Sequence, residues 1–477
     1  MPGSQSTRDT SDEGAMQGFS LRANNFVFGG RHIHYAWVTV AVAATMRLFS
    51  SSFRSSSSIL IPRLVDSFGW SYGAVGFGFA LQWIVSGLLG PSTGWLGDRY
   101  GVRLSLRLGA VLFIVGMVLT GTMNHLWQFY LFFGVILSAS MGLFQVPLTA
   151  AVTLWFRKHL GTGMGLLQSS QGIGPLVAVP VMLLIIHLMG GGIPGIRAAF
   201  WIPGIFGGVV LLSLSRFFYN EPAQIGLRPF GASENEPIKE VQRGPIARVR
   251  SQVFLKQAQH TSAFWNLIGI HFWGCAGHAV ILVYLVAMAE AEGVSKGLAA
   301  GAFVTLSVVS TITRFVVPIA SERMGSKGTM GVCFFLQTAP IVLLLFAHDP
   351  WHFYLFAVLF GIGFGGEMSA FPIINRQYYG SAPIGTTYGW QMMGAGIGMA
   401  TGALIGGQLR DWTGDFNATM GLSLVLSLIG VFSIMFLPTT KKHLLPDWEQ
   451  ELPEEAQTGE VQTGEVQTGE VQTVPKL

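Results

Sequence analysis

Charged side chains are scarce in this 477-residue chain, in which Asp, Glu, Lys and Arg together make up only 11%. Soluble globular domains carry about 25% charged residues, so the chain lacks the charge needed to cover a surface that faces water. Half of the residues are hydrophobic, and glycine and aromatic residues are frequent, as is typical of membrane-spanning helices. The composition therefore excludes an ordinary soluble domain and predicts an all-α membrane protein.

The sequence also lacks several motifs that other classes of protein require. The two cysteines, Cys275 and Cys333, lie inside apolar runs, where they are expected to pack as small hydrophobic residues and not to form a disulfide. The chain has no Walker-type phosphate loop and no nucleophile–base arrangement, which disfavours an ATP-driven pump and an enzyme. No cleavable signal peptide is predicted before the first apolar run. No cofactor, metal or nucleic-acid partner is expected.

Twelve apolar runs alternate with polar segments along the chain, and each is long enough to cross a bilayer, which takes about 20 apolar residues. The runs fall at 35–62, 72–97, 104–123, 126–153, 162–189, 196–218, 262–289, 297–320, 328–348, 351–377, 384–409 and 417–437. We therefore expect twelve transmembrane helices in two pseudo-symmetric six-helix halves. The predicted segments are a disordered N-terminus (1–34), an N-terminal half (35–218), a basic connector (219–260), a C-terminal half (261–437) and a disordered tail with Thr-Gly-Glu-Val-Gln repeats (438–477).

Lysine and arginine gather in the segments on one side of these helices. If the N-terminus is cytoplasmic, the outside loops hold only Arg63, Arg197, Lys296 and Arg410. By the positive-inside rule this arrangement places both termini and the connector in the cytoplasm. We expect a multi-pass protein of the plasma (inner) membrane that acts in the lipid bilayer as a monomer.

The two halves repeat at a single offset of 224 residues. The offset aligns Asp98–Gly101 with Glu322–Gly325, Gly161 with Gly385, Gly172 with Gly396, Arg47 with His271, and Arg54 with His278. Several matches at one offset indicate a duplicated half. The matched helix glycines, with Gly174 and Gly398, are expected to permit close contact between helices.

The segment from Gly94 to Arg103 reads Gly-Trp-Leu-Gly-Asp-Arg-Tyr-Gly-Val-Arg. It resembles the cytoplasmic signature of the major facilitator superfamily, and Ser321–Gly325 resembles its degenerate copy. Within the superfamily the chain resembles the monocarboxylate transporter group and its prokaryotic relatives, which include oxalate–formate exchangers. This second resemblance is carried by Phe68–Ser71, Trp155–Gly165, Glu221–Pro229, Thr387–Gly389 and Gly407–Gly414.

The resemblance implies the major facilitator fold and a gating motif. The residues of that motif are Gly94, Asp98, Arg99, Gly101, Arg103, Glu322 and Arg323. Asp98 and Arg99 are expected to latch the inward-closed gate and not to touch substrate.

The resemblance also implies a substrate site. Family members of this kind grip a substrate carboxylate with a cation on helix one and an arginine on helix eight, and Arg54 and Arg314 fall at those positions. Animal members carry an aspartate one turn before the helix-eight arginine. This chain has Ser310 there, so the group that would couple protons through that helix is missing.

Arg47, Arg54 and Arg314 lie well inside apolar runs, away from the run ends. A lipid-facing charge at mid-membrane costs about 2.5–3.5 kcal/mol, so these side chains are expected to face an aqueous cavity or a counter-charge. Arginine suits carboxylates because its planar fork donates two parallel hydrogen bonds. All three are candidate substrate-binding residues, and a structural pair such as Arg54 with Glu367 is the alternative.

Glu367, in the tenth run, is the clearest intramembrane acid. It is the proton-coupling candidate, with a static arginine pair as the alternative. His271 and His278 are candidates to bind substrate or carry protons, or they are hydrogen-bonded packing residues. Metal binding is not expected because no thiolate or carboxylate accompanies them at useful spacing.

The sequence thus predicts a secondary active transporter of small organic anions, above all monocarboxylates, that works by alternating access. Whether protons are coupled to transport is left open. One alternative is a dicarboxylate–monocarboxylate exchanger of the oxalate–formate type, with Arg47 as a second carboxylate anchor. The other is a transport-inactive membrane sensor that signals through the connector and the repeat tail.

Overall fold

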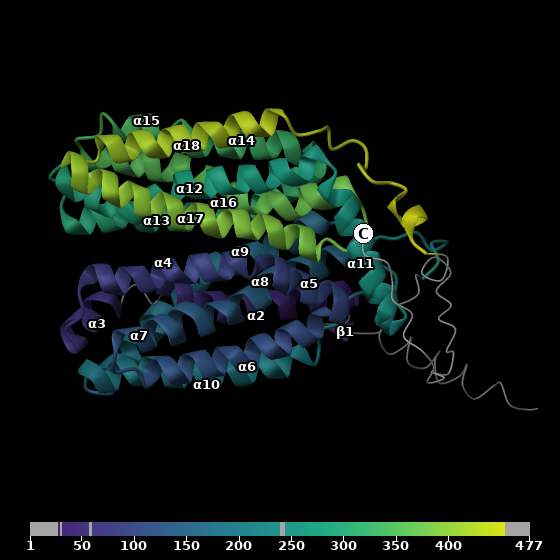
Figure 1. The fold of residues 1–477 in the computed structure, drawn as a ribbon, viewed down its shortest axis with the longest axis horizontal. Helices are drawn as coiled ribbons and strands as arrows, with labels where there is room; N and C mark the ends of the chain where they lie inside the picture. Colours follow the sequence, from purple (N-terminus) through teal and green to yellow (C-terminus); the bar gives the residue numbers. More distant parts are fainter. Residues whose placement is uncertain (1–26, 29–30, 57–59, 239–243, 454–477) are drawn as a thin grey trace, which may run out of the picture.

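Helices form nearly all the regular structure of the chain in the computed structural model, which describes residues 27–28, 31–56, 60–238 and 244–453. The N-terminal half contains α2 (Tyr35–Ser56), α3 (Ile61–Phe68), α4 (Tyr72–Leu88), α5 (Gly90–Tyr100), α6 (Val102–Gly121), α7 (Leu126–Phe129), the π-helix η2 (Tyr130–Ile136), α8 (Leu137–Leu154), α9 (Leu160–Leu188) and α10 (Gly192–Ser215). The C-terminal half contains α12 (Ser262–Ala291), α13 (Lys296–Met324), α14 (Ser326–Thr338), α15 (Ile341–Leu344), α16 (Pro350–Tyr379), α17 (Gly385–Thr413) and α18 (Asn417–Met435). Figure 1 shows the two halves as parallel bundles, and a short hairpin of β1 (Val27–Phe28) and β2 (Arg31–His32) precedes α2.

Among the described residues, ten helices are long and apolar enough to cross a membrane, and the bent pair α4–α5 forms an eleventh span. The 29-residue α17 completes the twelve. It is rich in glycine and packs against α4, α5 and α12. Because other helices cover most of its first half, that part of α17 does not need the apolar surface of a lipid-facing helix. The predicted all-α membrane fold with two six-helix halves is confirmed.

Proline interrupts three of the predicted runs. The first run is divided between α2 and α3, and a proline lies in the first turn of α3. The second run bends by 42° between α4 and α5, just before Pro91 near the start of α5. The ninth run is divided between α14 and α15 at Pro340. Proline lacks the N–H group that continues a helix and is tolerated at a helix start, which accounts for the first-turn prolines of α3 and α5 and for Pro340 just before α15.

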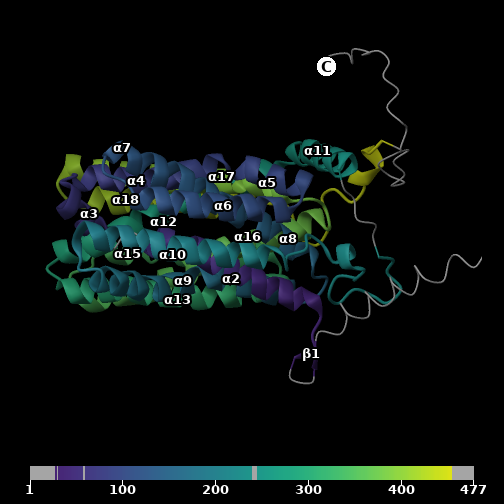
Figure 2. The same ribbon diagram turned by 90° about the horizontal axis from the view of Figure 1, so that it is seen from below.

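The connector and the segment after α18 fold together at one end of the bundle, which we call the connector end (Figures 1 and 2). The connector contains the short 3₁₀ helix η3 (Pro222–Ile225) and α11 (Pro245–Gln259), and the last segment contains η4 (Trp448–Glu451). The Trp448 ring packs 5.3 Å from the Phe254 ring of α11, and Arg250 forms an ion pair with Glu449. The sequence predicted disorder from residue 438 onward, whereas the described residues 438–453 include η4 and these contacts with α11. The Thr-Gly-Glu-Val-Gln repeats lie outside the described residues.

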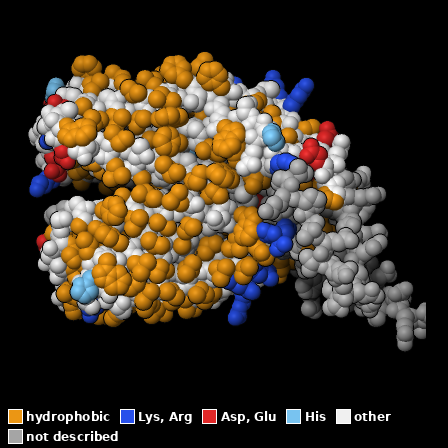
Figure 3. All heavy atoms as spheres, viewed as in Figure 1, with side chains coloured by type: hydrophobic (Ala, Val, Ile, Leu, Met, Phe, Trp, Pro, Cys, Tyr) orange, Lys and Arg blue, Asp and Glu red, His pale blue; other side chains and the backbone are white. Residues whose placement is uncertain are grey.

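Apolar side chains cover the long sides of the bundle, whereas Lys and Arg gather near its ends (Figure 3). Leu184, Phe206 and Val304 are more than half exposed on these sides, at 56%, 63% and 56%. A soluble monomer does not expose so much apolar surface. This surface is what a protein surrounded by lipid requires.

The two halves meet along two equivalent helix contacts, α9 with α13 and α17 with α4 and α5. Gly87 and Gly396 touch so closely that a Cβ atom on Gly396 would lie 2.6 Å from the Gly87 Cα atom. Gly172, which precedes Gly396 by 224 residues, makes the equivalent close contact with Thr311 on α13. These glycines permit close helix packing as predicted. The 224-residue offset therefore aligns equivalent contacts between the halves as well as equivalent residues.

Candidate functional site

Two carboxylates, one from each half, hold the connector end closed. Asp98, near the end of α5, accepts hydrogen bonds from the backbone N of Thr386 (2.6 Å), the Oγ1 of Thr386 (2.8 Å) and the backbone N of Gly385 (3.1 Å). These donors belong to the first turn of α17. Unpaired N–H groups and the helix dipole make such a helix start a binding site for an anion.

Glu322, near the end of α13, makes the matching contact. Its carboxylate accepts hydrogen bonds from the backbone N of Gly161 (2.6 Å) and of Leu160 (3.1 Å), in the first turn of α9. Each half therefore caps a helix of the other half, and we call the two contacts, Asp98 with α17 and Glu322 with α9, the gate latch. At the opposite end, which we call the far end, the space-filling view shows the two halves parted (Figure 3).

The two glycines of the motif have steric roles at the latch. A Cβ atom on Gly94 would overlap the backbone of Gly385, so glycine at this position lets α5 approach α17. Gly101 ends α5 with φ 89°, a backbone conformation that residues other than glycine rarely adopt. Both residues thus place Asp98 against the start of α17.

The arginines of the motif lie within their own half. The Arg99 guanidinium lies 4.8 Å from the centre of the Trp95 ring, and Arg103 donates from Nε to a backbone carbonyl after α10 at 2.9 Å. Arg323 is exposed at the end of α13. Of the pair that was expected to latch the gate, the structure brings only Asp98 to the interface.

Arg47 is buried in the middle of α2, with 2% of its surface exposed. Its Nη1 donates to the Gln145 carbonyl (3.0 Å) and to the Thr149 Oγ1 (3.1 Å), and its Nη2 donates to the Gln168 Oε1 (3.3 Å). Gln168 in turn donates to the Met368 carbonyl of α16 at 3.4 Å. The network therefore reaches the other half, and all of these acceptors are neutral.

Arg314, on α13, is 8% exposed. Its Nη1 donates across the interface to the Gln171 Oε1 of α9 at 3.4 Å, and its guanidinium lies 5.1 Å from the centre of the Phe364 ring. Arg47 and Glu367 both interact electrostatically with it. Among the described residues, neither Arg47 nor Arg314 has a carboxylate within 4.0 Å.

The third candidate arginine, Arg54, lies near the end of α2, seven residues after Arg47. A spacing of seven keeps two helix positions on nearly the same face. The side chain of Arg54 lies outside the described part of the chain, so its role in substrate binding stays a prediction.

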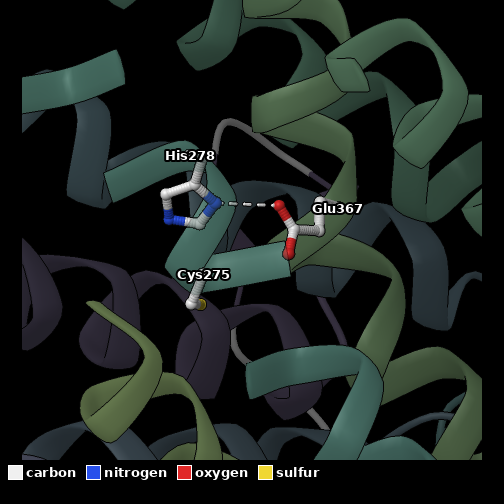
Figure 4. A group of neighbouring side chains, drawn as sticks. All are labelled: Cys275, His278 and Glu367. Atoms are coloured by element: carbon white, nitrogen blue, oxygen red, sulfur yellow. Dashed lines mark hydrogen bonds and ion pairs between the residues drawn. The ribbon is translucent and has the colours of Figure 1, made fainter. Parts of the chain in front are cut away.

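Glu367 is fully buried on α16, and its Oε2 lies 3.0 Å from the Nδ1 of His278 on α12 (Figure 4). Its Oε1 has no hydrogen-bond partner among the described residues. The other ring nitrogen of His278, Nε2, lies 3.1 Å from the Met399 sulfur. Glu367 thus pairs with a histidine, where the sequence suggested an arginine, and the two groups can share one proton.

His271, also on α12, lies in an apolar environment. Its ring stacks on the Phe371 ring with centres 3.8 Å apart, and its Nε2 lies 3.3 Å from the Met368 sulfur. These contacts fit the alternative of a packing residue better than a role in substrate binding.

Cys275, His278 and Glu367 place their donor atoms within 4.8 Å of one another (Figure 4). The sequence showed no thiolate or carboxylate at useful spacing from the histidines. The fold supplies both, because Cys275 lies one turn before His278 and Glu367 comes from a neighbouring helix. These donor types suit a transition metal, but the His278–Glu367 hydrogen bond already engages two of the three groups.

The three glutamines that contact the arginines, Gln145 through its backbone carbonyl and Gln168 and Gln171 through their side chains, were not among the predicted residues. Gln145, Gln168 and Gln171 lie on α8 and α9, and Gln168 is 3% exposed. Amide side chains in membrane helices commonly form hydrogen bonds between helices. A search for uncharged polar residues inside the apolar runs would have found all three.

Comparison with known proteins shows which family and which proteins this chain is similar to. The family model of the Major Facilitator Superfamily matches residues 43–336 and 267–466. The chain is 23% identical over 419 residues to the oxalate:formate antiporter of Oxalobacter formigenes, covering 83% of this chain and 91% of the antiporter. It is 22% identical over 422 residues to monocarboxylate transporter 12-B of Danio rerio, covering 84% and 87%.

Solved structures share the fold. The transporter FucP in its outward conformation superposes with a TM-score of 0.63 at 15% identity, covering 84% of this chain and 99% of FucP. A double tryptophan mutant of XylE superposes with a TM-score of 0.68 at 16% identity, covering 88% and 99%.

Proposed function

The chain belongs to the Major Facilitator Superfamily, and on that premise we propose that it carries small organic anions, above all monocarboxylates, by alternating access. It is a secondary membrane transporter and not an enzyme. We further propose that the connector end faces the cytoplasm, as the distribution of lysine and arginine predicts, and that the protein acts as a monomer in the plasma membrane.

The buried arginine pair carries this proposal. Arg47 and Arg314 are fixed by neutral acceptors and lack a contacting carboxylate among the described residues. A buried charge without a partner is costly, so the pair favours an incoming anion. A carboxylate can accept two parallel hydrogen bonds from one guanidinium, which supports a carboxylate as the anion.

The positions of the arginines connect binding to movement. Arg47 is on α2 of one half and Arg314 is on α13 of the other. An anion that contacts both draws the halves together around itself. The far end then closes, and the gate latch of Asp98 and Glu322 opens at the connector end. We propose that Arg54, which lies further along α2, also contacts the substrate anion.

Protons are proposed to enter through Glu367 and His278. The carboxylate faces His278 and Cys275 from α12, interacts electrostatically with Arg314 of α13, and also lies near Cys333 of α14. A proton on this pair changes the charge beside Arg314. Substrate affinity would then depend on the proton, which is the requirement for symport.

Exchange of a dicarboxylate for a monocarboxylate is the second candidate. Two guanidinium groups interact within one network, so they could each bind one end of an anion such as oxalate. The resemblance to the oxalate:formate antiporter at 23% identity supports this alternative.

A counterflow screen in reconstituted vesicles tests the proposal. Vesicles are loaded with an unlabelled anion, and uptake of labelled monocarboxylates, labelled oxalate and a neutral amide analogue is measured. Monocarboxylates are expected to exchange and the amide is not, because the amide has no negative charge for the arginines. Preferred exchange of oxalate would select the second candidate. A best substrate without negative charge would overturn the proposal, and absence of flux for every solute would favour a transport-inactive sensor.

A further inference from the structure

A cavity of about 570 Å³ lies at the connector end, where both halves and the last segment meet. Its charged lining comes from the segment between α8 and α9, the ends of α13 and α16, and the segment after α18, and consists of Arg157, Glu322, Arg376, Lys441, Lys442 and His443. Arg157 is paired with Glu236 at 3.3 Å. Lys441 and Lys442 are exposed at the rim.

Arg376 lines this cavity, and one edge of its guanidinium has no hydrogen-bond partner among the described residues. Its Nη1 is held by the carbonyls of Gly380 and Ala382. Its Nε and Nη2 are buried and have no hydrogen-bond partner among the described residues. These two nitrogens form one edge of the guanidinium, which binds two oxygens of an anion in parallel. The side chain is therefore held by one nitrogen, while the donors on the other two are left without a partner among the described residues.

The nearby acids do not neutralise this cavity through contact. Both oxygens of Glu322 accept backbone hydrogen bonds from α9. Asp98, which interacts electrostatically with Arg376, accepts its hydrogen bonds from α17. Arg376, Lys441 and Lys442 thus leave an excess of positive charge. A phosphomonoester, with a charge of about −1.5 to −2 and three acceptor oxygens, matches that excess better than a carboxylate.

We propose that this cavity binds a phosphomonoester group, carried either by a lipid headgroup or by a soluble phosphate compound. Arg376 binds it at the floor, and Lys441 and Lys442 bind it at the rim. Because the lining comes from both halves, the bound group holds the connector end closed beside the gate latch. It therefore slows transport, whichever solute the central site carries.

Titration of the purified full-length chain with inorganic phosphate tests the site. The unfolding temperature is measured in detergent, with sodium chloride at matched ionic strength as the reference. The double variant Lys441→Gln/Lys442→Gln removes the rim charges, which are exposed and make no latch contact. The matched control Arg248→Gln/Lys256→Gln removes two charges from α11 at the same end, outside the cavity lining. Phosphate is expected to raise the unfolding temperature of the parent and the control, with about tenfold weaker apparent affinity in the rim variant.

A second arm identifies the source of the phosphate. Flux is measured in phosphatidylcholine vesicles with and without phosphatidic acid. An effect of inorganic phosphate that depends on Lys441 and Lys442 assigns a soluble ligand, and slower flux only with phosphatidic acid, again dependent on these lysines, assigns a lipid. Arg376→Lys retains the charge but loses the fork, and it should weaken either effect. The proposal is overturned if the parent, the rim variant and the control respond alike in both arms.

Discussion

The buried arginines are stabilised by amides and hydroxyls. Arg47 donates to Gln145, Thr149 and Gln168, and Arg314 donates to Gln171. Neutral acceptors satisfy the N–H groups but leave the charge in place. A buried carboxylate in their position would form a static pair and compete with a substrate anion. Gln145 contributes only its backbone carbonyl, but the choice of glutamine over glutamate at Gln168 and Gln171 is consistent with anion binding.

Truncation of either arginine should weaken binding. Arg47→Ala or Arg314→Ala removes charge-assisted hydrogen bonds worth about 1.5–3 kcal/mol, or roughly ten- to hundredfold in affinity. Replacement by lysine retains the charge without the fork, so a smaller loss is expected. Binding of the labelled anion to purified protein measures the effect. Arg107→Ala, an exposed residue on α6, is the control. Parent-like affinity in both folded alanine variants would contradict the anchor.

Replacement of Glu367 should separate coupling from transport. Glu367→Gln retains a side chain of the same shape that can hydrogen-bond to His278 but cannot release a proton. The variant is expected to lose accumulation driven by a pH gradient while counterflow remains measurable. Accumulation and counterflow are compared in the same vesicles, and an unfolding curve establishes that the variant is folded. Accumulation equal to that of the parent would remove Glu367 from the coupling mechanism.

At the scale of helices, the latch joins the last turn of one helix to the first turn of another. Asp98 near the end of α5 caps α17, and Glu322 near the end of α13 caps α9. A charge at a helix start contributes up to about 2 kcal/mol in partly buried geometry. Two such contacts across the interface hold the connector end closed. Movement of the halves can break both together.

Weakening the latch should open the connector end. Asp98→Asn removes the charge from one contact, and the open population is expected to rise by up to roughly thirtyfold, corresponding to about 2 kcal/mol. A cysteine introduced at the buried residue Thr387, near the start of α17, should then react faster with a soluble maleimide, in a background in which the native cysteines, both buried here, are replaced by serine. Asp415→Asn removes a carboxylate at the far end and serves as the control. Unchanged labelling in the Asp98→Asn and Glu322→Gln variants would exclude the latch.

For the whole molecule, the connector and the segment after α18 lie at one end of both bundles (Figures 1 and 2). All connections at that end must therefore face the same side of the membrane. The exposed residues Ser233, in the connector, and Lys296, at the start of α13 at the far end, report on opposite sides.

Labelling of introduced cysteines determines this orientation. Ser233→Cys should react with an impermeant reagent only after cells are opened, and Lys296→Cys should react in intact cells, because basic segments stay in the cytoplasm. Reaction at Ser233→Cys in intact cells would reverse the proposed topology. The central site and the latch would then keep their geometry but serve transport in the opposite direction.

Much of this protein could be predicted from its sequence. The apolar runs predict the helices because a bilayer requires about 20 apolar residues per span. The 224-residue offset predicts the two related halves, and the cost of intramembrane charge singles out Arg47, Arg314 and Glu367. These inferences depend on local composition and spacing, which do not require knowledge of contacts between distant helices. The prolines at which three helices break are also visible in the sequence, although the predicted apolar runs continued through them.

Tertiary structure alone decided which side chains meet. His278 and Glu367 are 89 residues apart, and no spacing rule predicts that a histidine partners this acid. Helices bring Gln168 and Gln171 to arginines that the sequence paired only with acids. The cavity around Arg376 likewise combines residues from both halves with the segment after α18. Such contacts depend on how the helices pack against one another. The spacing of residues in a single sequence does not indicate which residues of distant helices will meet.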